Sequence, residues 1–184
     1  LLVYLLDFGH RKIVLRNLSF AFGKEKDTET LHILARKNFQ QFGMIAQEWM
    51  QLKHFTNKRN ELYRYLAVQG QKHLIEAKKN NPAVILLGAH FGNWEFAHLY
   101  YASHINRLNF IVRRIDNPFI EEERVAYNHH FGVNILYKEN GLRKAIRQLK
   151  KGQDLVIFAD QNSNLKEGVP CKFFNKNTST LPIV

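Results

Sequence analysis

The sequence predicts an α/β fold in which a mostly parallel central sheet is flanked by helices and preceded by N-terminal helices. Over most of the chain, short apolar runs alternate with segments of helical periodicity, as expected for parallel strands joined by crossover helices. The first third of the chain instead carries a long one-sided apolar stripe, which is typical of amphipathic helices. Its 184 residues suffice for one domain with a sizeable core.

Residues 1–60 are predicted to form a helical, membrane-proximal segment. Residues 1–22 mix short apolar runs with basic side chains, and they predict a pair of short helices packed on the core. The same composition equally suits an interfacial segment whose cations meet anionic lipid headgroups. Residues 28–52 then repeat apolar side chains along one side of a longer helix, which Asp27 can cap.

Residues 61–184 are predicted to form the α/β core, and each element can be placed from its pattern. Strands are expected at residues 62–68, 83–87, 108–112, 133–137 and 154–159. Helices are expected at residues 71–79, 94–103, 117–130 and 141–151. Asn93 and the pair Asn117–Pro118 are typical helix starts, because asparagine caps free N–H groups and proline suits the first helical position.

The composition is that of a globular protein with an anionic partner. Hydrophobic residues make up 45% of the chain and aromatic residues 12%, which excludes a disordered protein. The net charge of +11 points to nucleic acid, an anionic membrane surface, or an acidic protein or phosphorylated substrate. A single cysteine, Cys171, precludes an internal disulfide and suits a reducing compartment.

The two ends of the chain are interpreted as cuts through a longer protein. The chain starts at Leu1, and it stops within the apolar run 181–184. No stretch has the pattern of a cleavable signal peptide or approaches the roughly 18 apolar residues of a spanning helix. An N-terminal membrane anchor of the parent protein would therefore lie outside this sequence.

The stretch 83–100, AVILLGAHFGNWEFAHLY, holds the strongest candidate for a catalytic group. His90 follows the predicted strand, and Glu95 falls in the first turn of the helix that Asn93 caps. This H-x4-E spacing predicts that the two side chains meet across the turn. A carboxylate bonded to one ring nitrogen fixes the tautomer and leaves the other nitrogen as a general base, which suits a substrate that brings its own hydroxyl. The alternative is a structural histidine, since the spacing also occurs by chance.

Three predicted strands are followed by side chains that can act as a base, bind an anion or form hydrogen bonds with a substrate. These side chains are His90, Arg113, and Asp160 with Gln161. In open α/β sheets, ligands bind outside the carboxyl ends of the strands. A base, an anion-binding cation and a carboxylate–amide pair are therefore expected on one edge of the sheet. Strand ends are often polar, but this convergence favours a catalytic site.

Other kinds of site find less support. Nine histidines invite a metal site, but they lack the H-E-x-x-H spacing and one cysteine cannot build a structural zinc site, so no metal is expected. No phosphate-cradling glycine motif and no RNP-like motif occur, so no nucleotide or nucleic-acid partner is expected.

One predicted helix presents a cationic face, which is either solvated or docks an acidic carrier protein or phospholipid headgroups. It comprises Arg143, Lys144, Arg147, Lys150 and Lys151.

The segment His90–Glu95, reading HFGNWE, resembles the lipid A late acyltransferases, the lauroyl and myristoyl transferases of the lysophospholipid acyltransferase superfamily. The likeness continues in further short motifs: Arg16–Leu18, Ala21–Phe22, Arg113, Asp116–Pro118, Lys151–Gly152, Asp160–Gln161 and Phe173–Phe174. It covers nearly the whole chain. It implies a glycerol-3-phosphate-acyltransferase-like fold, with residues 61–184 as an acyltransferase catalytic core that is incomplete at its C-terminus.

The resemblance implies an enzyme of lipopolysaccharide biosynthesis on the cytoplasmic face of the bacterial inner membrane. Such an enzyme moves a fatty acyl chain from acyl carrier protein to a hydroxyl of a Kdo-lipid A precursor, without a cofactor, a metal or an acyl-enzyme. His90, oriented by Glu95, would deprotonate that hydroxyl. Arg113 would bind phosphate or stabilise the oxyanion. Asp160 would shape the acceptor site, where Gln161 and Asn93 are also expected to bind substrate.

Two departures from the family pattern leave the acceptor and the acyl chain open. Arg114 stands where the family usually has proline, and Asn175 stands where it has glycine. One rival is therefore an acyltransferase of the same family that acts on another lipid, such as a phosphatidylinositol mannoside or an ornithine-type lipid. The other rivals are a thioesterase that uses the same base, and a module that only binds anionic membranes or nucleic acid.

Overall fold

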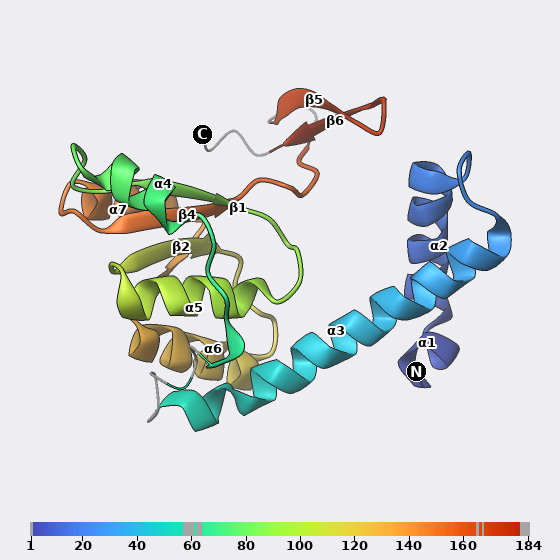
Figure 1. Cartoon of the computed structure of the whole chain (residues 1–184), viewed down its shortest axis with the longest axis horizontal. Helices are drawn as coiled ribbons and strands as arrows, with labels where there is room; N and C mark the ends of the chain where they lie inside the picture. The colour runs from blue at the N-terminus through green and yellow to red at the C-terminus, as the bar shows by residue number, and fades with distance from the viewer. Residues whose placement is uncertain (1, 57–60, 62–63, 165, 167, 181–184) are drawn as a thin grey trace. The chain divides into compact units, whose positions relative to one another are not determined.

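Helices occupy the first part of the chain, and strands alternating with helices occupy the rest (Figure 1). The computed structural model describes residues 2–56, 61, 64–164, 166 and 168–180. The chain divides into two units, residues 1–50 and 51–184. The boundary predicted near residue 60 adjoins residues 57–60, which lie outside the described ranges.

The N-terminal unit confirms the helices predicted at residues 1–22 and 28–52. Their bounds are α1 Leu2–Leu6, α2 Phe8–Phe22 and α3 Thr28–Thr56, and α3 continues into the second unit. Helix α3 begins where expected, because Asp27 accepts a hydrogen bond from the Thr30 N–H at 2.8 Å and so satisfies a group without a partner inside the helix. Within the described ranges, no helix combines the length and the apolar character needed to cross a bilayer.

The second unit confirms the mostly parallel sheet. Its strands are β1 Ile85–Gly88, β2 Leu108–Val112, β3 Val133–Tyr137 and β4 Asp154–Phe158, all parallel and in the order β1-β4-β2-β3. Its helices are α4 Gln71–Lys78, α5 Trp94–His104, α6 Pro118–Phe131 and α7 Gly141–Leu149. The chain therefore steps in one direction from β1 through β2 to β3, and then returns to place β4 inside the sheet.

This strand order fixes the layers of the unit. Right-handed crossovers place α5 and α6 on one face of the sheet and α7 on the other, because the chain reverses direction between β3 and β4. Figure 1 shows α5 and α6 on the side of the sheet away from α7. Toward α7, Leu155 and Ile157 form a buried cluster with Ala145. Toward α5, the Phe110 ring lies 5.2 Å from the ring of His98. The central strands are thus buried on both faces.

One expected strand is absent from the described residues, and another is less buried than its neighbours. Residues 64–65 form a 3₁₀ turn and residues 66–70 have no regular structure, so the strand predicted at 62–68 does not form in its described part; residues 62–63 lie outside that part. Strand β1 overlaps the expected stretch 83–87 but is only partly buried, since Ile85 is 54% and Leu87 72% exposed. Helices α5 and α7 pack against β2, β3 and β4 instead, which leaves one face of this edge strand open in the described structure.

A hairpin that the sequence patterns did not predict follows the sheet, and Figure 1 draws it in red. Strand β5 spans Val169–Phe173, and strand β6 spans Lys176–Thr180. The two strands pair antiparallel, with Val169 opposite Thr180 and Phe173 opposite Lys176. Every residue of β5 is exposed, so the hairpin adds little to the core.

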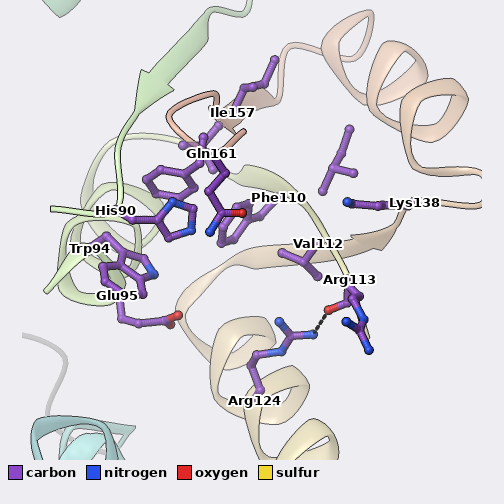
Figure 2. A pocket seen from close by; sticks show the side chains of 13 residues that line it. His90, Trp94, Glu95, Phe110, Val112, Arg113, Arg124, Lys138, Ile157 and Gln161 are labelled. Atoms are coloured by element: carbon purple, nitrogen blue, oxygen red, sulfur yellow. Dashed lines mark hydrogen bonds between the residues drawn. The ribbon is translucent and has the colours of Figure 1, made fainter. Parts of the chain in front are cut away.

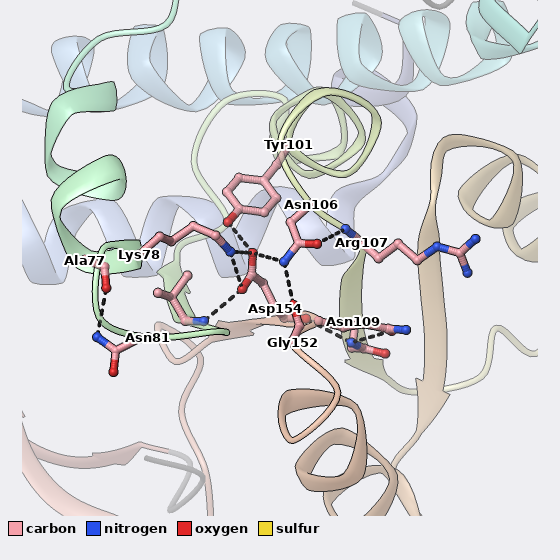
Figure 3. Close-up of polar contacts among 11 residues, drawn as sticks. Ala77, Lys78, Asn81, Tyr101, Asn106, Arg107, Asn109, Gly152 and Asp154 are labelled. Atoms are coloured by element: carbon pink, nitrogen blue, oxygen red, sulfur yellow. Dashed lines mark hydrogen bonds and ion pairs between the residues drawn. The ribbon is translucent and has the colours of Figure 1, made fainter.

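Asp154, at the start of β4, is fully buried and lies at the centre of a polar network (Figure 3). Its carboxylate accepts hydrogen bonds from Nζ of Lys78 at 2.6 and 2.8 Å and from the hydroxyl of Tyr101 at 2.6 Å. The side chain of Asn106 and the N–H of Val84 donate at 3.0 and 2.8 Å. Burial raises the pKa of Asp154, but these hydrogen bonds hold it below its ordinary value. The ionised carboxylate therefore ties α4, α5 and the neighbouring strand starts together.

Asp154→Asn is expected to lower the free energy of unfolding of this unit by about 3 kcal/mol at neutral pH. The amide cannot balance the charge of Lys78, and removing one partner of a buried pair typically costs this much. Urea unfolding followed by Trp94 fluorescence in a Trp49→Phe background measures the loss in the second unit, because the chain has only these two tryptophans.

The loss should shrink in acid. Since the folded-state pKa of Asp154 lies below its unfolded value, the unfolded chain binds the proton first, and the stabilisation disappears as the pH falls below about 4. The matched control is Glu76→Gln, which removes an exposed pair with Lys79 on the helix that carries Lys78. It should change stability by less than about 0.5 kcal/mol. Equal losses in both variants, or a loss that persists in acid, would contradict the role of Asp154.

Candidate active site

Strand register brings His90 and Asp160 together at the carboxyl edge of the sheet. In the β1–β4 pair, Gly88 lies opposite Phe158, and each of the two polar residues stands two positions farther along its own segment. The N–H of His90 donates to Oδ2 of Asp160 at 2.7 Å, and the ring Nδ1 lies 2.8 Å from Oδ1. One carboxylate thus holds both the backbone and the ring of the histidine.

This contact fixes the protonation pattern of the ring. Burial raises the pKa of Asp160, but the hydrogen bonds from His90 outweigh burial and hold the pKa below its ordinary value. Because an ionised carboxylate only accepts hydrogen bonds, the neutral imidazole carries its proton on Nδ1 and its lone pair on Nε2. No described residue forms a hydrogen bond with Nε2. This nitrogen is therefore available as a base.

Aromatic neighbours hold the plane of the imidazole. The indole of Trp94 meets the His90 ring edge-on at 5.0 Å between centroids, and the ring of Phe158 lies tilted to it at 4.9 Å. Gly88 makes room for this packing, because a Cβ at that position would lie 2.5 Å from the phenyl ring of Phe158. The glycine that ends β1 thus permits the aromatic packing that positions the histidine.

Glu95 lines the same site but does not orient His90 as predicted. Its carboxylate accepts a hydrogen bond from the hydroxyl of Tyr127 at 2.9 Å and lies 3.5 Å from Nε2 of His98. Burial lowers the pKa of His98, so this ring adds no positive charge beside Glu95. The predicted place of Glu95 at the ring nitrogen is taken by Asp160, because the strand register delivers that carboxylate to Nδ1.

His90 borders a cavity of about 310 Å³ (Figure 2). Its apolar lining consists of Trp94, Phe110, Ile111, Val112, Val156, Ile157 and Phe158. Its polar lining consists of His90, Glu95, Arg113, Arg124, Lys138 and Gln161. The wall therefore offers three cationic side chains and one carboxylate beside an apolar surface, a lining that suits a ligand with an anionic group and an apolar portion. None of the lining residues is serine, threonine or cysteine.

The two arginines of the cavity are held differently. The side chain of Arg113 is 76% exposed and pairs with Asp116 at 2.9 Å. Arg124 is largely buried and donates to both carboxylate oxygens of Glu121, at 2.7 and 2.9 Å. It also donates to the backbone oxygen of Arg113 at 3.1 Å, as the dashed line in Figure 2 shows. Arg124 therefore stabilises the backbone of the segment from which the exposed guanidinium of Arg113 can reach an anion.

The remaining predicted binding residues lie at different places. Gln161 lines the cavity beside His90. Asn93 caps α5 by accepting a hydrogen bond from the N–H of Glu95 at 3.2 Å, and it borders a neighbouring cavity of about 290 Å³ instead. Asp160 is not part of the cavity wall. Its contacts suit orienting the histidine better than shaping an acceptor site.

The sequence patterns did not single out Arg124, Tyr127 and Lys138 as residues of the site. Tyr127 meets Glu95 across 32 residues of sequence, so no local spacing reports the contact. For Arg124 the only signal is its position three residues after Glu121, which predicts an ion pair on a helix but no cavity.

The sequence model of one protein family, described as bacterial lipid A biosynthesis acyltransferase, matches residues 2–184. The match includes both units and every residue of the cavity wall. Among curated proteins, no sequence matches the chain at a significant level.

Proposed function

The chain belongs to the bacterial lipid A biosynthesis acyltransferases, and on this basis we propose that it moves a fatty acyl chain from acyl carrier protein to a hydroxyl of a Kdo-lipid A precursor. Family membership makes it an acyltransferase with an acyl donor and a lipid acceptor. The identity of both substrates, and a place on the cytoplasmic face of the inner membrane, belong to the proposal. The net charge of +11 supports them, because the carrier protein, the phosphorylated lipid and the membrane surface are all anionic.

The observation that carries the proposal is the open Nε2 of His90 beside a cavity whose described lining contains no serine, threonine or cysteine nucleophile. In the proposed reaction, Nε2 removes the proton of the acceptor hydroxyl while the hydroxyl oxygen attacks the carbonyl carbon of the donor thioester. The tetrahedral intermediate then expels the carrier thiolate, which takes the proton from the imidazolium. An ester forms, the thioester bond breaks, and His90 returns to its starting form.

Two carboxylates support the base in this scheme. Asp160 fixes the tautomer through Nδ1 and stabilises the imidazolium that forms during the reaction. Glu95 adds negative charge to the cavity wall, and the hydroxyl of Tyr127 holds its carboxylate in place. The proposal thus keeps Glu95 in the catalytic site as an electrostatic support and gives the orienting role to Asp160.

Arg113→Ala should lower kcat/KM for a phosphorylated acceptor by about tenfold to a hundredfold. The proposed contact is a hydrogen bond between charged groups, which contributes about 1.5–3 kcal/mol. Steady-state kinetics across acceptor concentrations measure the loss. Stability should stay unchanged, since the side chain is exposed.

The matched control for this change is Arg114→Ala. The guanidinium of Arg114 lies 4.2 Å from the ring centroid of Tyr137 and is not part of the cavity wall. Its removal takes away the same charge without the proposed contact. Equal losses in the two variants would mean that only the overall charge matters, and an unchanged KM in Arg113→Ala would remove Arg113 from acceptor binding.

The proposed function is tested by incubating the protein in detergent with acyl carrier protein that carries a labelled acyl chain. Parallel reactions contain or omit a Kdo-lipid A precursor. Label should move to the precursor as an ester. Label released as free acid at the same rate in both reactions would identify a thioesterase. Transfer only to other lipids of an acceptor panel would retain the family and overturn the proposed acceptor.

A further inference from the structure

The tip of the β5–β6 hairpin, residues Lys172–Lys176, presents two phenylalanines to solvent. Phe173 is 65% and Phe174 47% exposed, and their rings meet edge-on at 4.7 Å between centroids. Two adjacent aromatic side chains on one exposed turn form a compact apolar surface. Large exposed apolar groups of this kind mark sites of contact with a partner or a membrane.

The backbone of the hairpin tip is strained at one of these rings. Phe173 pairs with Lys176, so Phe174 and Asn175 form a two-residue turn, and both have positive φ angles of 46° and 62°. Such turns favour asparagine and glycine, and a left-handed conformation costs other residues about 1–2 kcal/mol. Asn175 suits the turn, whereas Phe174 does not. An aromatic ring kept in spite of local strain is typical of a functional position.

The charges around the hairpin tip indicate what kind of surface it meets. Lys172 and Lys176 flank the two rings, and the segment 168–180 contains no acidic residue. On segments that lie in a membrane interface, phenylalanine side chains are buried at the boundary between lipid headgroups and acyl chains, and lysine side chains reach from that depth back to anionic headgroups. The combination is complementary to an anionic lipid surface.

The base of the hairpin is hydrogen-bonded to the loop that carries Asp160, the carboxylate that orients His90. The hydroxyl of Thr180 donates to the backbone oxygen of Ala159, and the hydroxyl of Ser179 donates to the backbone oxygen of Ser163. Asp160 and Gln161 lie between these two anchor points. A surface that holds the hairpin tip would therefore also hold the edge of the active site at a fixed distance.

We propose that the hairpin tip inserts into the interface of an anionic bilayer and holds the active site next to the membrane in which the acceptor lies. The inference rests on the proposed function only in that the acceptor is a membrane lipid. Insertion needs no catalysis, so its test can fail separately from the transfer assay. The insertion surface lies in the second unit and is distinct from the basic N-terminal segment.

The cysteine of β5 allows a local test on the complete chain. Cys171 is the only cysteine, is exposed, and points to the same face of the strand as Phe173 two residues later. A polarity-sensitive fluorophore on Cys171 is expected to shift to the blue when vesicles of equal parts phosphatidylethanolamine and phosphatidylglycerol are added. The control carries the fluorophore on Glu76→Cys in a Cys171→Ser background and should not shift. This local readout separates insertion of the hairpin from binding through any other surface.

The double variant Phe173→Ser/Phe174→Ser should require at least about tenfold more vesicle lipid for the same shift, because two aromatic side chains leave the interface. The matched control is Phe119→Ser, which removes a ring that is 77% exposed on α6 and should leave the titration unchanged. A Cys171 probe that does not respond to vesicles overturns the proposal, whether or not the protein sediments with them. A response to an acidic carrier protein instead of vesicles also overturns it, as does an unchanged titration in the folded double variant.

Discussion

His90→Ala is expected to lower kcat for acyl transfer by about a thousandfold while the protein remains folded. The change removes the only described group of the cavity that has a free lone pair on nitrogen, and general base catalysis typically contributes 10²- to 10⁴-fold. A single-turnover assay with saturating acyl donor and acceptor measures the chemical step directly. Urea unfolding in parallel should show a small change, because the ring contacts Trp94 and Phe158 at the rim of the core.

His73→Ala is the matched control, since His73 lies exposed on α4 and forms no part of the cavity wall. It should retain wild-type kcat. Near-normal turnover in His90→Ala would show that another group or the substrate itself removes the proton. A large loss in both variants would trace the effect to the loss of any histidine rather than to the site.

The second large effect is expected from Asp160→Asn, which should lower kcat by about a hundredfold to a thousandfold. An asparagine amide can donate to Nδ1, which moves the ring proton of His90 to Nε2 and removes the base. In serine proteases the corresponding change on the orienting aspartate costs about 10⁴-fold, chiefly by selecting the wrong tautomer. The same single-turnover assay measures the loss, and Asp160→Glu should recover part of it because a carboxylate returns.

Glu95→Gln separates the two carboxylates. It keeps the hydrogen bond from Tyr127 and removes the charge, so we expect a loss of about tenfold in kcat from weaker support of the imidazolium. Comparing the loss of kcat in Glu95→Gln with that in Asp160→Asn decides which carboxylate orients His90. A greater loss in Glu95→Gln than in Asp160→Asn would return the orienting role to Glu95 and would mean that the histidine ring changes partner when substrate binds.

The fold was predictable where hydrophobic patterns and helix caps agree. Asn117 with Pro118 starts α6 and Asp27 caps α3 as expected, because these signals act within a few residues. The strand predicted at 62–68 was wrong because β-forming composition alone does not supply a neighbouring strand to pair with. The β5–β6 hairpin was not predicted because its turn and its first strand both depart from the usual sequence signals. Its turn uses Phe174 where the usual pattern has asparagine or glycine, and Pro170 lies within its first strand.

The sequence predicted where the candidate site lies better than it predicted which of its residues contact one another. The rule that ligands bind at the carboxyl ends of strands correctly placed His90, Arg113 and Gln161 around one cavity. The partner of the histidine was not predictable from spacing, because H-x4-E reports only residues on neighbouring turns. The actual contact spans 70 residues and depends on β4 pairing beside β1, which no local pattern specifies.

The pairing of β1 with β4 also sets the order in which the protein can mature during its synthesis. Ile85 leaves the ribosome 70 residues before its partner Leu155, and at 5–20 residues per second this separation lasts roughly 4–14 seconds. During that interval β2 and β3 can already pair with each other, whereas β1 has no strand to pair with until β4 is made. The base and its carboxylate can therefore meet only after the last strand of the sheet has been made. A nascent chain therefore has no complete catalytic site until β4 has been synthesised.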